Sequence, residues 1–336
     1  MDRYPLGLNT YCLRAFRWPD LKLLDYAASL KLDSIFLQDS LDPRTNDPAH
    51  WTEVREAAKR LDLHLETGTG ASLPRDLNDI QPAVTLLRSA IKRASAMGSP
   101  LVRTLIAGDR EHLPKAPIQQ IQDTMIKVLR AVRSEAIDAN LKIAIENHKD
   151  LLCWETRQVI EGAGKDFVGS YLDTGNPVFC MEDPMETVET LGPLAVTFHL
   201  RDSVVYETRH GAAVQWVPLG EGVVDFHKIV ARGRELCPNV SVYIKPITGR
   251  PPVTMAYLDP EFMRNWQDVK ASTLARFIAL AKNGHPYEKE MVIEDIAGRT
   301  PPETYAAALQ FQQKDHMERS VDYGKKHLDL GIRWRA

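Results

Sequence analysis

Three apolar segments of the chain each end in a side chain that can bind a metal ion or exchange a proton. Short apolar runs of this kind are typical of strands buried in a parallel sheet, and such sheets bind ligands at the carboxyl ends of their strands. Two carboxylates and one imidazole suit Mn²⁺, Mg²⁺, Co²⁺ or Zn²⁺, which would polarise a substrate carbonyl or alkoxide. The predicted metal ligands are Glu146 at the end of 141–146, Asp173 at the end of 168–173 and His199 in 194–202.

An ordinary structural role is the alternative for each of these side chains. An acid at a strand end can cap the following helix, and a histidine can bond a neighbouring carbonyl. One such residue would favour the structural role, whereas three at corresponding positions favour a functional cluster. His148, two residues after Glu146, is expected either to act as a general base or, like most loop histidines, to face solvent or form a local hydrogen bond.

Other polar residues near the predicted strand ends are candidates for substrate binding. Asn176 is expected either to bond a sugar hydroxyl or to hold its own turn. Arg201 is expected to pair with Asp202 beside the site or to bind substrate oxygens through its planar guanidinium. Arg103 is expected in the pocket or in a salt bridge at the rim, and Arg250 near the substrate.

Eight strand segments alternate with helical ones, which predicts an α/β fold, a (β/α)8 TIM barrel, with its active groups at the carboxyl ends of the strands. A doubly wound open sheet is the main alternative, but no glycine-rich phosphate fingerprint follows the first strand. The predicted strands are 7–11, 33–38, 61–66, 101–106, 141–146, 168–173, 194–200 and 240–245. The main predicted helices are 21–30, 47–61, 77–97, 117–140 and 225–236, with two more starting near 154 and 183.

The segment after the seventh strand, 203–222, is predicted to be a long loop whose turn at 220–222 approaches the ligand. We divide the chain into a barrel domain over 1–252 and a C-terminal helical extension over 253–336, packed on the barrel. Apolar spacing predicts helices at 262–278 and 301–329 in this extension. It would cover the rim of the site or form the interface of a homo-oligomer.

The totals describe an ordinary globular protein: 336 residues, 44% hydrophobic, 26% charged and a net charge of −3. That charge gives no global attraction for nucleic acid or an anionic membrane, so neither is an expected partner. No apolar run reaches the roughly 20 residues of a membrane helix, and the first residues lack a signal-peptide pattern. Four scattered cysteines suit reduced thiols. We expect a cytoplasmic protein.

Four motifs together resemble the xylose isomerase-like TIM barrels, the superfamily of sugar phosphate isomerases and epimerases. The resemblance covers about residues 5–250 and implies a sugar substrate. It also implies a divalent metal held by Glu, Asp, His and a second Glu from the last strand, of which the first three match Glu146, Asp173 and His199. The motifs are Ile145-Glu-Asn-His148, Leu172-Asp-Thr-Gly-Asn176, Phe198-His-Leu-Arg-Asp202 and Leu219-Gly-Glu-Gly-Val-Val-Asp225.

Lys245 stands where the resemblance implies the second glutamate. A charged ammonium cannot ligate a metal and repels a divalent cation. Three interpretations follow: a metal held by three protein ligands and water, a metal-free site with Lys245 paired to Glu146 or Asp173, or a non-catalytic sugar-binding barrel.

The leading hypothesis is an isomerase or epimerase that uses Glu146 or His148 to abstract a proton α to the carbonyl of a sugar or keto-sugar. The alternative is a lyase on 3-keto glycosides, resembling the C-glycoside deglycosidases. In such an enzyme one base suffices, and His148 takes that role while Lys245 stabilises an enolate or donates a proton. A nucleic-acid repair activity like that of endonuclease IV lacks candidates for the additional zinc ligands.

Overall fold

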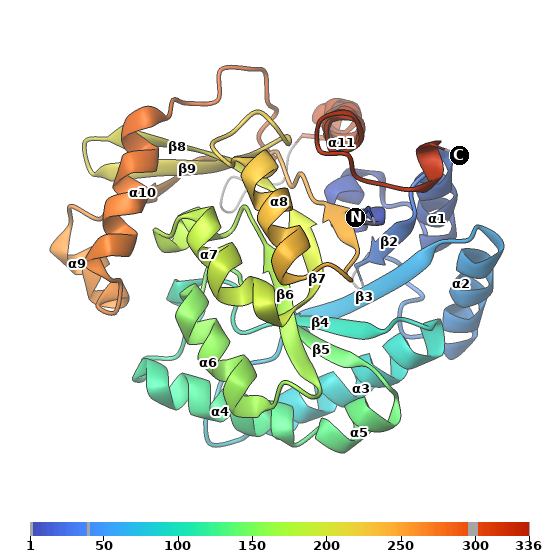
Figure 1. Cartoon of the computed structure of the whole chain (residues 1–336). Coiled ribbons are helices and arrows are strands. Elements are labelled where there is room, and N and C mark those ends of the chain that lie inside the picture. Colours follow the sequence, from blue (N-terminus) through green and yellow to red (C-terminus); the bar gives the residue numbers. More distant parts are fainter. Residues whose placement is uncertain (1–2, 39–40, 295–301, 336) are drawn as a thin grey trace.

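The structure, a computed structural model, describes residues 3–38, 41–294 and 302–335. Eight parallel strands form a barrel at its centre (Figure 1). They are β1 (Leu6–Asn9), β2 (Ser34–Leu37), β3 (His64–Ala71), β4 (Leu101–Leu105), β5 (Lys142–Glu146), β6 (Val168–Asp173), β7 (Ala195–Leu200) and β10 (Val242–Ile244). The ring closes because β1 pairs with both β2 and β10. The predicted (β/α)8 barrel is therefore confirmed.

Helices surround the barrel, and local signals in the sequence explain several of their ends. The side chain of Asp47 accepts a hydrogen bond from Ala49 N and caps α2, as its position before Pro48 predicts. The predicted helix over 117–140 is divided, because Val132 has a non-helical φ of −117°. The helices are α1 (Asp20–Ser29), α2 (Pro48–Arg60), α3 (Gln81–Met97), α4 (Ile118–Arg130), α5 (Arg133–Asp138), α6 (Cys153–Ala163), α7 (Pro184–Leu191) and α8 (Phe226–Leu236).

The segment predicted to be a long loop is instead an antiparallel hairpin. It consists of β8 (Asp202–Thr208) and β9 (Gly211–Val217), and β11 (Val253–Met255) pairs with β9. Gly211 makes the tight connection possible, since its φ of +142° is unfavourable for other residues. All seven residues of β9 are buried, so the hairpin packs as part of the protein interior.

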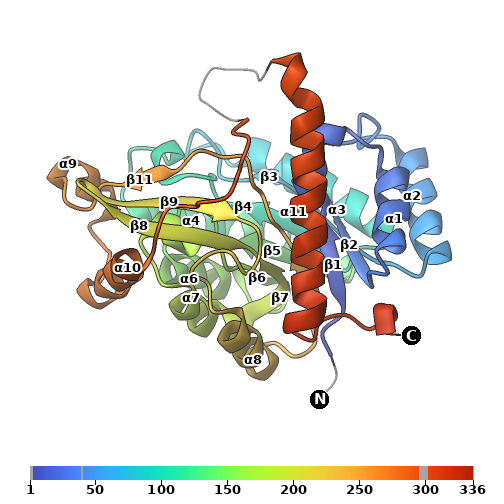
Figure 2. The same ribbon diagram turned by 90° about the horizontal axis from the view of Figure 1, so that it is seen from above.

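The C-terminal segment contains α9 (Pro260–Met263), α10 (Ala271–Asn283) and α11 (Ala306–His327). The single helix predicted at 262–278 is therefore broken, and the start predicted at Pro301 lies outside the described residues. Figure 2 shows α10 beside the hairpin and α11 running alongside β1. A Cβ built on Gly324 in α11 would lie 3.2 Å from Ile244 and 3.9 Å from Leu6. Helix α11 thus covers the seam between β10 and β1, the place of the eighth helix of such a barrel.

Aromatic side chains fill part of the barrel interior around His199. Its ring is stacked on Tyr171 and Tyr243, with centroid distances of 3.7 and 4.7 Å, and Phe36 meets it edge-on at 5.2 Å. Within the described part of the chain, no helix has the length and apolar character needed to cross a membrane.

Candidate active site

A cavity of about 470 Å³ opens at the carboxyl ends of the barrel strands. Five cationic side chains line it, together with His148 and the aromatic rings of Tyr11, Phe179 and Trp216. None of its described lining residues is an acid. The five cations are Arg103 on β4, Lys149 after β5, Arg201 after β7, and Lys245 and Arg250 after β10.

Lys245 occupies the buried end of this cavity. Its Nζ lies 2.7 Å from Glu146 Oε1 and 3.1 Å from Asp173 Oδ2, and both acids are fully buried beneath it. An ammonium has three N–H donors, so one remains after these two bonds. The sequence-based interpretation in which Lys245 pairs with Glu146 or Asp173 agrees with these contacts, and the lysine pairs with both.

Two arginines surround the same pair of acids. Arg103 Nε donates to Glu146 Oε2 at 2.5 Å, and Arg201 Nη2 lies 3.0 Å from Asp173 Oδ2. With Lys245, three cations therefore contact two carboxylates. Burial acts to raise the pKa of Glu146, but the charges of Arg103 and Lys245 outweigh it and hold that pKa well below its usual value. The acid is ionised at neutral pH.

The pKa of the Lys245 ammonium is lowered from its ordinary value. Burial is the main cause and the charge of Arg201 adds to it, whereas Glu146 and Asp173 oppose the shift. This ammonium therefore releases a proton more readily than an exposed lysine does, which suits a group that meets a developing negative charge.

Two asparagines hold the acids in place. The side chain of Asn147 both donates to Asp173 O and accepts from Asp173 N, at 2.9 and 2.8 Å. Asn176 Nδ2 donates to Glu146 Oε1 at 3.1 Å, while its Oδ1 accepts from Arg201 Nη1 at 3.0 Å. Asn176 is fully buried and does not line the cavity, so its side chain positions Glu146 and Arg201, a role different from the two expected from the sequence.

His148 lines the cavity, and its Nδ1 is hydrogen bonded to Gly108 O. Since a carbonyl can only accept, Nδ1 carries the proton and Nε2 keeps its lone pair. The surrounding protein desolvates the ring and lowers the pKa of His148 to about 3, although Glu146 opposes this shift. The imidazole is therefore neutral and able to accept a proton.

His199 lies deeper in the barrel and does not line the cavity. Its Nε2 is 3.2 Å from Thr197 Oγ1, and its Nδ1 has no hydrogen-bond partner among the described residues. Burial, reinforced by Lys245, holds the pKa of His199 well below its usual value. The ring is thus neutral and fixed between Tyr171 and Tyr243.

The predicted ion pair between Arg201 and Asp202 does not form. The Asp202 carboxylate instead accepts hydrogen bonds from the backbone N–H groups of Ser203, Gly220, Gly222 and Val224. The turn at 220–222, expected to approach a ligand, wraps around this carboxylate. A Cβ on Gly222 would lie 2.3 Å from Asp202 Oδ1, which explains the glycine.

Sequence reasoning missed the aromatic wall of the cavity and Lys149. Trp216 lies on β9, in the segment that was predicted to be a loop, so its place in the cavity wall was not predicted. Its ring lies 4.4 Å from the guanidinium carbon of Arg201 and 4.8 Å from Phe179. The signal that could have identified the hairpin is the run Ala212–Val217 directly after His210-Gly211, a turn between two apolar segments.

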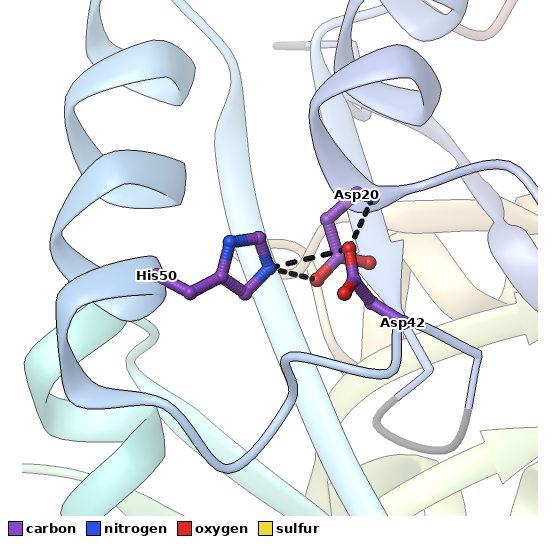
Figure 3. A group of neighbouring side chains, drawn as sticks. All are labelled: Asp20, Asp42 and His50. Atoms are coloured by element: carbon purple, nitrogen blue, oxygen red, sulfur yellow. Dashed lines mark hydrogen bonds and ion pairs between the residues drawn. The ribbon is translucent and has the colours of Figure 1, made fainter.

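A separate cluster was also missed. Asp20, Asp42 and His50 form the one group of three such residues, within the described ranges, whose ligand atoms lie close enough to hold a metal ion (Figure 3). His50 Nε2 is 3.0 Å from Asp20 Oδ2 and 3.4 Å from Asp42 Oδ2. Asp20 N donates to Asp42 Oδ2 as well, so the members of this group satisfy one another. Their separation in sequence gave no recognisable ligand spacing.

A family model described as xylose isomerase-like TIM barrel matches residues 24–235, more than half of the chain. The chain belongs to this family. It is 26% identical over 181 residues to the 3-oxo-isoapionate decarboxylase of Pectobacterium atrosepticum, a match that covers 53% of this chain and 60% of that protein. The chain therefore spans less than two thirds of the length of this curated relative.

Solved structures of other proteins share the fold of this xylose isomerase-like barrel. A D-psicose 3-epimerase crystallised with D-fructose superposes with a TM-score of 0.60 at 15% identity, covering 96% of this chain and 98% of the other. The IolI protein with a bound zinc atom gives a TM-score of 0.57 at 15% identity, covering 81% and 99%.

The residues predicted to hold a metal do not fit one in this xylose isomerase-like barrel. Lys245 places an ammonium within hydrogen-bonding distance of both carboxylates. Arg103 and Arg201 add two more positive charges, which a divalent cation would have to overcome. His199 Nε2 is engaged with Thr197, so the imidazole is not presented to these acids through that atom.

Proposed function

We propose that this protein is an enzyme that works through an enolate of a keto-sugar or keto-sugar derivative, with the Lys245 ammonium as the electrophile. The observation that supports this is the position of Lys245 Nζ between Glu146 and Asp173 at the buried end of the cavity. Two of its three donors are fixed by the acids, which leaves one for a substrate carbonyl oxygen.

The physical basis is electrostatic stabilisation by groups that are already in place. Negative charge develops on the carbonyl oxygen as an enolate forms, and a donor fixed beforehand in a water-poor site stabilises that charge strongly. The two acids hold the ammonium, while Arg201 adds positive potential beside it. Lys245 thus takes the polarising role that a metal ion has elsewhere.

His148 supplies the proton transfer in this proposal. Its neutral Nε2 takes a proton from the carbon next to the carbonyl, and the electrons of that C–H bond move into the enolate. Return of a proton to the neighbouring carbon gives an isomer, and return to the other face of the same carbon gives an epimer. Elimination from a 3-keto glycoside would begin with the same enolate.

Decarboxylation of a 3-oxo sugar acid is the second candidate. The curated relative named a 3-oxo-isoapionate decarboxylase and the low pKa of His148 favour it. Here the bond between the α carbon and the carboxylate breaks, CO₂ leaves, and its bonding electrons form the enolate. No base is needed for that step, and a proton then goes to the α carbon.

The test is to incubate the protein with ketoses, 3-keto glycosides and 3-oxo sugar acids in D₂O, following deuterium uptake by NMR and CO₂ release. We expect turnover of at least one class that persists in EDTA and falls about 100-fold or more in Lys245→Met. Lys326→Met, an exposed lysine on α11, is the matched control and should retain activity. Turnover that is lost in EDTA, or unchanged in Lys245→Met, would contradict the proposal. No turnover of any class would favour the sugar-binding alternative.

A further inference from the structure

The charge of the cavity wall bears on the kind of molecule that the site accepts. Five cations and no acid line the described part of the cavity. Among the described residues, the acids paired with these cations do not face the cavity: Glu146 and Asp173 are fully buried, and Asp109 pairs with Lys149 at 2.7 Å. A neutral sugar would gain little from this wall, whereas an anion would be attracted to it.

Arg201 has donors that the protein does not use. This side chain is completely buried, yet its Nε and Nη2 make no hydrogen bond to any described residue. Nη2 is close to Asp173 Oδ2 at 3.0 Å, but as an ion pair without hydrogen-bond geometry. Leaving such buried donors unsatisfied is costly, so a ligand acceptor at this place would remove a penalty. A planar guanidinium edge suits a carboxylate in particular.

Other wall residues fit the rest of such a ligand. The Lys149 ammonium lies 5.5 Å from the Trp216 ring centroid and is 20% exposed, so it can meet an anion on its way in. Trp216 and Phe179, whose rings are tilted by 46° to each other, provide an aromatic wall of the kind against which carbohydrate C–H groups pack. A cavity of about 470 Å³ accommodates a small sugar acid but not a polymer.

We infer that the substrate is a sugar acid whose carboxylate is bound by Arg201, with Lys149 and Lys245 supplying further positive charge. The reaction at the neighbouring carbonyl rests on the proposed function, but the charge preference can be tested without it. This inference restricts the substrate to sugars that carry a carboxylate, whereas the sugars named in the structural comparisons are neutral.

The experiment uses ligands that cannot react through an enolate. Isothermal titration calorimetry compares D-gluconate and D-galactonate with D-glucitol and galactitol, which differ only by a CH₂OH in place of the carboxylate. D-glucitol 6-phosphate is added as a phosphate-bearing anion. We expect at least one aldonate to bind about tenfold or more tightly than its alditol, with an affinity that falls as salt rises.

Variants locate the carboxylate. Arg201→Lys keeps the charge but loses the planar edge, so aldonate affinity should fall about tenfold. Arg201 is buried, so its replacement could also disturb folding. A second variant, Lys149→Gln, changes a partly exposed residue instead and should weaken aldonate binding mainly at low salt. Arg232→Lys and Lys228→Gln, on the outer surface of α8, are the matched controls and should bind as the wild type does.

Equal affinity for aldonates and alditols, or no aldonate binding at millimolar concentration, would overturn the inference. Tighter binding of D-glucitol 6-phosphate than of either aldonate would overturn the assignment to a carboxylate. Aldonate binding without turnover of any keto compound would support the sugar-acid site while contradicting the proposed reaction, so the two failures can be told apart.

Discussion

At the scale of single residues, Lys245 sets the charge around the two acids at the buried end of the cavity. Its ammonium forms ion pairs with both Glu146 and Asp173, the two acids that the family resemblance assigns to a metal. A glutamate at this position would instead bring a third carboxylate to the same place, and three acidic oxygens favour a hard divalent cation.

We therefore expect Lys245→Glu to bind about one Mn²⁺ per chain more than the wild type, since the substitution replaces a repelling charge with a ligand. Elemental analysis after equilibrium dialysis measures the difference, so any ion bound elsewhere cancels. Lys245→Gln removes the charge without adding a carboxylate and should gain little. Equal metal content in the wild type and Lys245→Glu would show that the acids are not arranged to accept an ion.

His50 is the residue on which the second acidic cluster depends. It contacts both Asp20 and Asp42, and all three side chains are buried (Figure 3). His50→Leu removes this shared partner and leaves two carboxylates facing each other, which should lower the free energy of unfolding by about 2–4 kcal/mol. Urea denaturation measures the loss. His285→Leu, an exposed histidine, should change little, and a similar loss in both variants would argue against a specific role for the cluster.

At the scale of elements, a buried acid in the segment before α7, Glu182, is hydrogen bonded to the start of α6 and makes stability depend on pH. Both carboxylate oxygens of Glu182 accept a hydrogen bond from the backbone N–H of Cys153. Burial nevertheless raises the pKa of Glu182 from 4.5 to about 8. Between these values the folded state binds a proton that the unfolded state has lost. The contribution of Glu182 to stability therefore falls as pH rises through this interval and falls no further above it.

We expect Glu182→Gln to flatten this part of the pH dependence, because glutamine stays neutral. Unfolding free energies at about pH 6 and pH 9 should differ less in the variant than in the wild type, with the variant relatively more stable at the higher pH. Glu161→Gln changes an exposed acid of α6, paired with Arg157, and should keep the wild-type slope. An unchanged slope in Glu182→Gln would mean that this acid is already ionised in the folded protein.

The barrel strands and helices could be predicted because each is a short segment with a strong apolar pattern and clear ends, such as Asp47-Pro48 before α2. The hairpin of β8 and β9 could not be predicted, because Glu207, Thr208 and Arg209 gave the whole segment the pattern of a polar loop. The pairing of β8 and β11 with β9 and the packing of α10 bury this region, and none of these contacts is visible in a local pattern.

The same distinction applies to the candidate site. Strand ends in a parallel barrel converge, so the proximity of Glu146 and Asp173 could be predicted from their positions alone. The hydrogen-bond partners of these two side chains could not be predicted, because they depend on side-chain rotamers and on residues from elements that are distant in the sequence. Arg201 turned to Asp173 rather than to its neighbour Asp202, and Trp216 came from an unpredicted strand.

At the scale of the whole molecule, the fold joins segments that are far apart in the sequence. Helix α11 packs beside the 3-10 helix η1 (Thr10–Phe16) that follows β1, and Ala15 N donates to Gln313 Oε1 across about 300 positions. The position of α11 depends on the barrel having closed, so its role as the last helix of the ring could not be predicted from its own residues.

This arrangement has a consequence for how the protein folds during its synthesis on the ribosome. While the chain is being made, β1 emerges before β10 can pair with it and before α11 can cover Leu6 and Ile244. Until then a strand edge and apolar surface stay open to other nascent chains. The barrel thus closes when β10 pairs with β1, and its seam is covered only after α11 has followed; the interval before these two steps is when the molecule most needs a chaperone.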